Sequence, residues 1–267
     1  MANNTVYANK VLEAKAKDLL TTSINTRNLM TIDSDLVENA GMTKTINTYT
    51  YAGTAEELAN GVGNTASKRG NITYTGNDYT VKMVQQAFDY TDEDFMKDPS
   101  IVDNMLKGAN QVMINKMTSD FLAQVKGSGV TLGATFAKGK KIGYDAIVDG
   151  ISALNIEDES KLFIIIPNAW KADLRKDADY KSARMGEVIY NGQVGTIAGL
   201  PVIATKALTD RALVMSKEAV KLFMKKDVEI EQDRNADTRT NSVYLRTAYV
   251  VALVDATKIA KITEAAA

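Results

Sequence analysis

The fold of this 267-residue chain is decided by residues 228–262, whose sequence is VEIEQDRNADTRTNSVYLRTAYVVALVDATKIAKI. Val228 and Ile230 alternate with charged residues, which is typical of a half-buried strand. The polar, charge-dense segment QDRNADTRTN follows, and a run rich in β-branched and aromatic residues then extends from Val243 to Val254. Such residues favour strands. The sequence therefore predicts strands on both sides of a polar loop.

A second strand-rich region lies in the first third of the chain, at residues 44–83. It begins with KTINTYTY, and its interior, residues 52–70, carries only Leu58 and Val62 as sizeable apolar side chains. A hairpin of this length has about twenty residues in each leg and reaches ~60 Å when extended. A compact domain of this size has a radius of gyration near ~18 Å, so the hairpin would overhang the body. Because a lone hairpin is marginal in water, we expect it to need a partner surface; a flexible surface loop is the alternative.

The clearest helix follows the acidic stretch DYTDEDFMKDP. Apolar residues recur at three- and four-residue spacing from Ile101 to Val125, which is the period of one helix face. Asp98 is a good N-cap and Pro99 suits the first helical position, whereas Gly127 is a stop signal. About 27 residues give ~40 Å of helix, a length that suits a structural spine.

The second half of the chain has an α/β pattern. Residues 127–143, GSGVTLGATFAKGKKIG, predict a linker before it because glycine and small residues dominate there. Helical segments are expected at residues 144–154, 168–176 and 217–220, and strands at 161–166, 187–190, 193–205 and 212–215. Residues 222–230 then lead into the final region.

The segment ahead of the hairpin, residues 3–32, predicts an arm with one amphipathic helix. Its apolar stripe includes Val11, Leu12, Leu19 and Leu20. Two interpretations are open for this helix. It either packs on its own domain or lies across a neighbouring subunit.

The amino-acid composition of the chain excludes several classes of function. The chain has no cysteine and no histidine, which excludes disulfides, thiolate nucleophiles, cysteine-based zinc sites and histidine-dependent catalysis. A net charge of -1 gives no global attraction to nucleic acid. No stretch approaches ~20 uninterrupted apolar residues, and no signal peptide begins the chain, so we expect a soluble protein made in the cytosol.

Two clusters of polar residues contain the residue types of a cation-binding or catalytic site, but neither has the sequence pattern of one. The acidic residues of the first are Asp89, Asp92, Glu93, Asp94 and Asp98. We expect them to place negative charge where the dipole of the long helix favours it, with a hard-cation or paired-carboxylate site as the alternative. In the second, Asp233, Asn235 and Asp237 have the odd-position spacing of an EF-hand loop. Thr238, however, replaces the turn glycine, and Tyr244 replaces the bidentate glutamate. No catalytic, cofactor or metal residue is predicted.

Three segments carry a resemblance to a known family. They are ITYTGNDYTVKM at residues 72–83, GTIAGLPVIATKAL at 195–208, and residues 228–262 with their QDRNADTRTN loop and LVDATK ending. Together with the order of the elements, they resemble the major capsid proteins of tailed bacteriophages, the family named after phage Hong Kong ninety-seven.

The resemblance implies an α+β fold of the Hong Kong ninety-seven type. The implied parts are an N-terminal arm with the entry to the peripheral domain (residues 1–43), an extended hairpin loop (44–83), a peripheral domain with the spine helix (84–135), an axial domain (136–227) and C-terminal strands returning to the peripheral domain (228–267).

The resemblance also implies a function. The chain would be a structural major capsid protein, not an enzyme, that forms the hexamers and pentamers of an icosahedral head shell around packaged DNA. Its implied partners are other copies of itself, a portal protein, double-stranded DNA in weak non-specific contact and, since no helical segment precedes the arm, a separate scaffolding protein. No cofactor and no membrane are implied. An encapsulin-like compartment is the alternative with the same fold, and a small-molecule enzyme using carboxylates is the alternative from another class.

Charged residues at subunit contacts are expected to set register more than strength. The candidates are Glu56, Glu57, Lys68 and Arg69 at the hairpin tip, with Arg234 and Arg239 in the polar loop. In certain relatives, a lysine–asparagine isopeptide bond cross-links the subunits covalently. Lys68 is the only lysine at the tip, but neither the matching asparagine nor the activating carboxylate is identifiable in the sequence.

Overall fold

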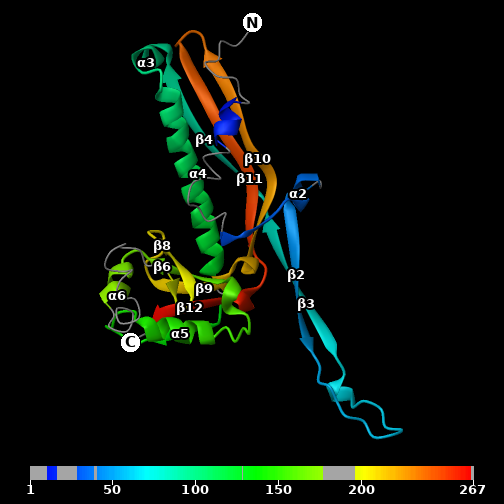
Figure 1. The fold of residues 1–267 in the computed structure, drawn as a ribbon. Coiled ribbons are helices and arrows are strands. Elements are labelled where there is room, and N and C mark those ends of the chain that lie inside the picture. Colours follow the sequence, from blue (N-terminus) through cyan, green and yellow to red (C-terminus); the bar gives the residue numbers. More distant parts are fainter. Residues whose placement is uncertain (1–10, 17–28, 39–40, 128, 177–195, 266–267) are drawn as a thin grey trace.

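The computed structural model describes residues 11–16, 29–38, 41–127, 129–176 and 196–265. Figure 1 shows three parts: a tall body in which helix α4 lies along a four-stranded sheet, a lobe at its foot on a six-stranded sheet, and a projecting two-stranded hairpin. Within these ranges, no helix combines the length and the apolar character that a membrane crossing requires. The arrangement is the α+β architecture that the sequence predicts.

The body sheet has the strand order β1-β10-β11-β4. Its members are β1 (Thr31–Asp33), β10 (Val220–Asn235), β11 (Thr240–Leu253) and β4 (Lys82–Thr91). β1 runs parallel to β10, and the two other pairs are antiparallel. The strands that flank the polar loop are therefore confirmed. β10 begins earlier than the predicted segment, and its pairing shifts register between Met224 and Glu229, as at a β-bulge.

Helix α4 (Ile101–Val125) starts later than the sequence indicates. Its N-cap is Ser100, and Asp98 instead ends a short helix, α3 (Asp92–Lys97). Thr91 and Asp94 form a capping box at the start of α3. The prediction of Asp98 as the N-cap of the long helix is therefore wrong, because the acidic stretch builds a capped helix of its own.

The described turn of the arm, residues 11–16, is helical and packs on its own chain. Leu12 and Ala16 are buried in one cluster with residues of α4 and of the body sheet. Lys15 Nζ lies 2.9 Å from Asp103 Oδ1 on α4. For this turn, the interpretation of a helix packed on its own domain is the one that the structure supports.

The lobe sheet has the order β5-β12-β9-β6-β8-β7. Its strands are β5 (Gly133–Phe136), β12 (Ile259–Glu264), β9 (Arg211–Ser216), β6 (Leu162–Pro167), β8 (Leu200–Thr205) and β7 (Thr196–Ile197). Helices α5 (Tyr144–Ser152) and α6 (Lys171–Lys176) accompany it, with single turns η3 (Glu159–Lys161), η4 (Lys217–Ala219) and η5 (Ala256–Lys258). The predicted strand at residues 187–190 lies outside the described residues.

Two segments of the lobe differ from the sequence-based expectation. The predicted linker, residues 127–143, contains β5, which pairs in parallel with β12. A Cβ atom at Gly133 would lie 2.8 Å from Cγ of Lys261, so the absence of a side chain permits this close approach. β12 itself pairs in the lobe sheet, whereas β10 and β11 return along α4. The domain boundaries given above stay predictions.

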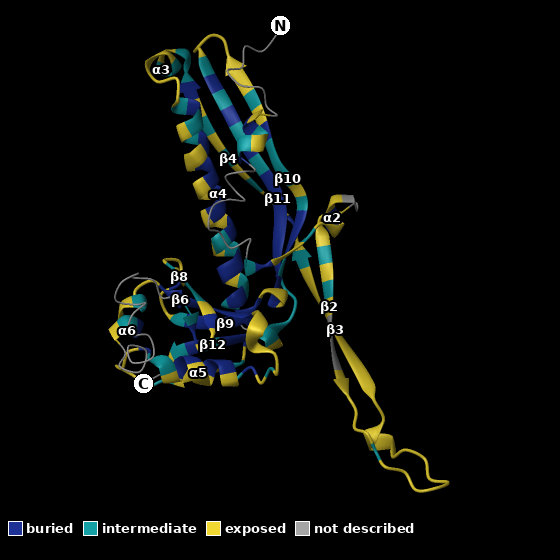
Figure 2. Cartoon of the chain, viewed as in Figure 1, coloured by how far each residue is buried: buried dark blue, intermediate teal, exposed yellow. Residues whose placement is uncertain are grey.

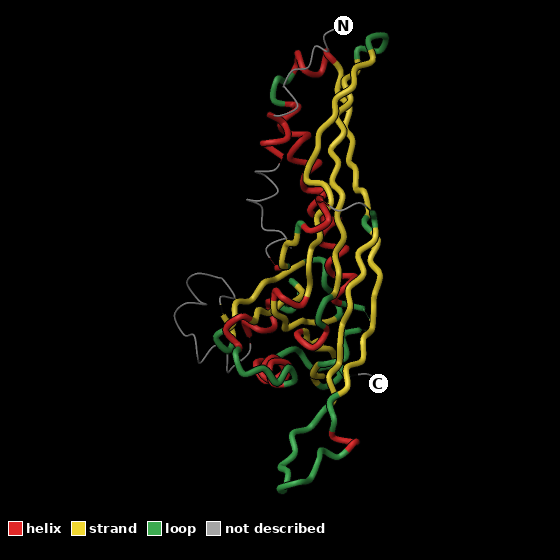
Figure 3. Tube along the Cα trace, turned by 90° about the vertical axis from the view of Figure 1, so that its right-hand side faces the viewer, coloured by secondary structure: helices red, strands yellow, loops and turns green. Residues whose placement is uncertain are grey.

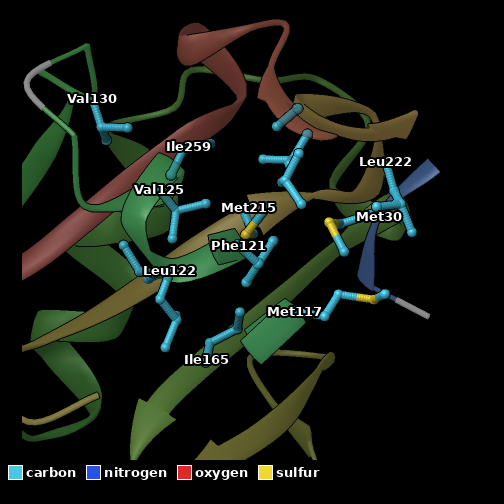
Figure 4. Packing of buried hydrophobic residues seen from close by; sticks show 14 of the residues in the cluster. Met30, Met117, Phe121, Leu122, Val125, Val130, Ile165, Met215, Leu222 and Ile259 are labelled. Carbon is cyan, nitrogen blue, oxygen red and sulfur yellow. The ribbon is translucent and has the colours of Figure 1, made fainter. Parts of the chain in front are cut away.

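The body and the lobe share one buried cluster at the foot of α4. Figure 4 shows Phe121 and Val125 of α4 beside Ile165 of β6, Met215 of β9 and Leu222 of β10. Phe121 is fully buried. Because buried cores are close-packed, this cluster fixes how the lobe sits on the body.

Replacing Phe121 by alanine tests the role of this cluster. The F121A variant should lose about 3–5 kcal/mol in the free energy of unfolding, because a large buried side chain leaves a cavity between the two sheets. Lys107→Ala, on the exposed side of the same helix, should stay within about 0.5 kcal/mol of the unmodified chain. Urea unfolding of the unassembled protein measures both, and similar losses in the two variants would contradict the assignment.

Candidate assembly interface

The hairpin is a two-stranded sheet of its own. β2 (Thr43–Ala52) and β3 (Asn71–Thr80) pair antiparallel, from Thr43 opposite Thr80 to Ala52 opposite Asn71. Ten residues of extended strand span ~33 Å. Figure 2 shows this ribbon exposed along most of its length, and Figure 3 shows it continuing the line of the long strands beyond the body. The predicted overhanging hairpin is confirmed, with residues 53–70 as its tip. Its predicted end at Met83 is wrong, because Lys82 and Met83 begin β4 and pair with β11 in the body sheet.

One face of the hairpin is apolar at its far end. Tyr51 lies directly opposite Ile72, and Tyr74 is two residues further along β3, so the three side chains share a face. Tyr51 is 62% exposed and Tyr74 is 68% exposed. The neighbouring residue Thr73 belongs to the other face. We call Tyr51, Ile72 and Tyr74 the hairpin apolar face.

The base of the hairpin is tied to the body sheet by several contacts. The Tyr79 hydroxyl donates to the carbonyl oxygen of Leu253 at 3.1 Å, and burial raises the pKa of Tyr79. Lys44 Nζ lies 3.6 Å from Asp35 Oδ2 on α2 (Asp35–Glu38) and 5.3 Å from the ring centroid of Phe223. These contacts fix the direction in which the ribbon leaves the body.

The tip is organised around Glu56. Its two carboxylate oxygens accept from the backbone N–H of Thr65 at 2.9 Å and from the Thr65 hydroxyl at 2.6 Å. These hydrogen bonds, the side-chain one first, lower the pKa of Glu56. Lys68, in the single turn η2 (Ala66–Lys68), places Nζ 3.8 Å from the same carboxylate. Glu56 and Lys68 thus hold the tip together within one chain.

The neck between the ladder and the tip depends on two glycines. A Cβ atom at Gly53 would lie 2.7 Å from the Tyr51 hydroxyl oxygen and 2.8 Å from Cα of Gly70. At Gly70 the ring of Tyr51 likewise occupies the space that a side chain would need. The Tyr51 ring therefore lies at the end of the ladder in the space that the absence of side chains at Gly53 and Gly70 leaves open.

The polar loop between β10 and β11 forms an ion-paired corner with α3. Arg234 Nη2 lies 2.7 Å from Asp92 Oδ2, and Arg239 Nε lies 2.9 Å from Glu93 Oε1. Asn241 donates to the other Asp92 oxygen at 2.8 Å. Hydrogen bonds from Arg234 and then Asn241 hold the pKa of Asp92 below its ordinary value. We call these residues the arginine corner.

The six predicted contact residues therefore fall into two groups. Glu56, Lys68, Arg234 and Arg239 have partners within their own chain. Glu57 and Arg69 are exposed and have no partner among the described residues. A role between subunits stays a prediction for all six. Sequence reasoning missed the hairpin apolar face, although tyrosine and isoleucine at alternate positions were its signal.

The arrangement offers surfaces instead of a reaction centre. In the part of the chain that the structure describes, no group of three or more acidic residues is placed to hold a metal ion. The acidic cluster instead supplies the cap of α3 and the arginine corner. What the geometry presents is an overhanging ribbon with one apolar face.

Known proteins resemble this chain along most of its length. The family model described as phage capsid protein matches residues 74–262. The major capsid protein of Staphylococcus phage phiMR11 is 26% identical over 241 residues, which cover 87% of this chain and 84% of that protein. The capsid structure of cyanophage P-SCSP1u has a TM-score of 0.70 at 11% identity, covering 100% of this chain and 92% of that one. A virus-like particle from Pyrococcus furiosus has a TM-score of 0.64 at 10% identity, with 95% and 98% covered.

Two adjacent glutamates provide a test of the tip. Glu56→Ala should speed amide hydrogen exchange at Thr65 and around it, because the N–H loses its carboxylate acceptor. Glu57→Ala changes the next residue, which has no partner among the described residues, and should leave exchange unchanged. Exchange measured by mass spectrometry on the unassembled protein distinguishes the two, and equal protection in both variants would contradict the assigned role of Glu56.

The arginine corner makes a prediction about pH. Because the pKa of Asp92 is depressed in the folded chain, its pairing stabilises the fold above the ordinary value of 3.8 and is lost as the pH falls through the depressed pKa. Arg234→Met should raise the pKa of Asp92 toward that value. The stability difference from the unmodified chain should shrink at low pH.

Carbon-13 NMR titration of the Asp92 carboxyl group measures this shift. Arg69→Met, on the distant hairpin tip, is the matched control and should leave the titration unchanged. An unshifted Asp92 in the Arg234 variant would show that the ion pair does not form in solution.

Proposed function

The chain belongs to the phage capsid protein family, and on this basis we propose that its copies join through the hairpin into the hexamers and pentamers of an icosahedral head shell around packaged DNA. It is a structural major capsid protein and a component of the virion, not an enzyme. In the proposed shell, its role is to present the hairpin and the body at fixed angles to other copies of the chain.

The observation that carries this proposal is the hairpin. A two-stranded ribbon has too little core to be stable in water alone, yet this one extends beyond the body with Tyr51, Ile72 and Tyr74 exposed. Exposed apolar patches of this kind mark interaction surfaces. A shell subunit whose ribbon rests on the next copy accounts for both features.

Overlap through the hairpin is a head-to-tail contact. The ribbon of one copy and the body of another are different surfaces, and such heterologous contacts give rings when the rotation closes. Obligate interfaces of this kind bury on the order of 2,000–5,000 Å². Glu57 and Arg69 remain the tip residues most available for pairing with a neighbour, since the other tip charges are engaged within the tip.

Three further partners belong to the proposal because the family implies them. They are a scaffolding protein during assembly, a portal protein at one vertex and the packaged double-stranded DNA. The net charge of -1 supports weak, non-specific contact with DNA over tight binding. An encapsulin-like compartment stands second, because the likeness to the Pyrococcus furiosus particle concerns the fold alone.

Electron microscopy of the purified protein tests the assembly. The concentrated protein, with scaffolding protein if required, should form ring-shaped capsomers or closed shells. A variant in which residues 53–70 are replaced by a two-residue Asn-Gly turn should keep the body fold, because that turn type closes antiparallel ladders, but should lose the shells.

Circular dichroism and thermal unfolding provide the control for this variant. They should show that the shortened chain retains the secondary structure and cooperative unfolding of the body. A full-length protein that stays a monomer under all such conditions, or a shortened chain that still forms shells, would refute assembly through the hairpin.

A further inference from the structure

Six cations gather on the lobe, where the loop between β5 and α5 meets helix α6. Residues 137–143 and α6 together carry these six cations and one carboxylate, although the whole chain has a net charge of -1. Figure 1 shows α6 on the side of the lobe that faces away from the hairpin. We call the six residues the lobe basic cluster: Lys138, Lys140, Lys141, Lys171, Arg175 and Lys176.

Two side-chain contacts join the loop to α6. Phe136 at the end of β5 packs edge to face on Trp170, which directly precedes α6, with ring centroids 5.5 Å apart and an interplanar angle of 86°. Further along, Lys141 of the loop forms an ion pair with Asp173 of α6. Cations from two segments that are about thirty residues apart in the sequence therefore lie on one surface.

A tight turn presents two of the lysines. The N–H of Lys140 donates to the carbonyl oxygen of Ala137 at 3.1 Å, and Gly139 has a φ of 72°, so residues 137–140 form a β-turn. The N–H of Gly139 also donates to a carboxylate oxygen of Glu264 at 2.6 Å, which ties the turn to β12. Lys138 and Lys140 are both exposed on this anchored turn.

The carboxylates near the cluster are too few to neutralise it. Asp173 pairs with Lys141, and Glu264 accepts from the backbone of the turn. Asp145 in the first turn of α5 is a third, so the cations outnumber these carboxylates by six to three. Like charges held together repel one another, which favours a partner of opposite charge. Four cations have no partner among the described residues: Lys138, Lys140, Lys171 and Lys176.

Several other cations of the lobe are paired instead. Lys161 and Lys258 lie 3.7 Å and 2.6 Å from Glu218. Arg211 lies 2.7 Å from Asp210. The unpaired charge of the lobe basic cluster is therefore a local feature, which the small net charge of the chain conceals.

The composition of this surface suits nucleic acid better than protein. Its two large apolar residues, Ile142 and Leu174, are only 2% and 0% exposed, so the surface has no apolar centre. Protein interfaces have an apolar core and are depleted in lysine. Phosphate groups, in contrast, are bound by lysine and arginine alone, and double-stranded DNA carries one charge per ~1.7 Å of its axis.

We propose that the lobe basic cluster binds the phosphate backbone of double-stranded DNA without regard to sequence. This inference rests on the proposed function and specifies where the subunit contacts the packaged DNA. A few lysine contacts give weak binding that falls steeply with salt, because each contact releases counterions from the DNA. Many weak sites on one shell add up in affinity, yet each site releases its phosphates easily, so the DNA can slide during packaging.

A matched pair of double variants tests the site. Lys138→Gln with Lys140→Gln removes two charges from the cluster, and Lys97→Gln with Lys107→Gln removes two charges from exposed positions of the body. Fluorescence anisotropy of a labelled DNA duplex measures binding by the unassembled protein at several salt concentrations. The cluster variant should bind more weakly, and its plot of log affinity against log salt should flatten by about 2, because each lost phosphate contact removes ~0.9 from the slope. The body variant should match the unmodified protein.

Lysine footprinting locates the contact without a substitution. The unmodified protein is treated with an acetylating reagent with and without the duplex, and mass spectrometry reads each lysine. Lys138, Lys140, Lys171 and Lys176 should lose reactivity when DNA is bound. Lys97 and Lys107 should keep their reactivity. Circular dichroism and electron microscopy should show that both double variants fold and still form shells.

The outcomes separate the DNA site from the capsid function. Equal DNA affinity in the two double variants, or protection of Lys97 and Lys107 in place of the cluster, would overturn the DNA site and leave the capsid function standing. Loss of shells from the cluster variant with unchanged DNA binding would overturn it in favour of a contact between copies. An unmodified protein that binds DNA through the cluster but never forms shells would refute the proposed function and not the DNA site.

Discussion

Where α4 ends, Phe121 and Val125 pack against strands that belong to different sheets: β10 and β11 of the body, and β6 and β9 of the lobe. Because this cluster is buried and shared, the lobe and the body cannot turn against one another without opening a cavity. The hairpin is attached to the same sheet, because Tyr79 and Val81 at its base contact residues of β11 and β10. The cluster at the foot of α4 therefore fixes the angle between the body and the lobe. The contacts at the base of the hairpin fix the direction of the third part.

Charge and apolar surface have separate roles in this subunit. The charged groups of the arginine corner and of the hairpin tip pair within one chain. Arg234 lies 2.7 Å from Asp92, and Lys68 lies 3.8 Å from Glu56. Exposed ion pairs contribute little free energy, so these pairs shape loops more than they stabilise the fold. The hairpin apolar face, by contrast, carries no charged side chain. Burial of apolar area, at ~25 cal/mol per Å², is then available for association between copies.

Much of the fold was accessible from the sequence because its signals are local and periodic. The apolar spacing from Ile101 to Val125 predicts α4, and alternating threonine and tyrosine predict the hairpin. The predictions that failed concern residues whose structure depends on competing local signals or on partners far along the chain. Asp98 lost its predicted role because Thr91 caps an earlier helix, and β5 forms in a glycine-rich segment because β12, far along the chain, pairs with it. The pairing of Arg234 with Asp92 joins residues 142 positions apart, which a single sequence does not reveal.

In the proposed assembly, the one-sided projection of the hairpin gives the subunit a donor end and an acceptor end, as in a directional polymer. Growth from such units stops only when the last acceptor meets the first donor. A copy with a shortened ribbon would still offer its acceptor and would be incorporated, but it would leave the next position without a donor. Small amounts of the shortened copy would block assembly of the intact copies. A mutation that damages the hairpin would therefore be dominant over the normal gene.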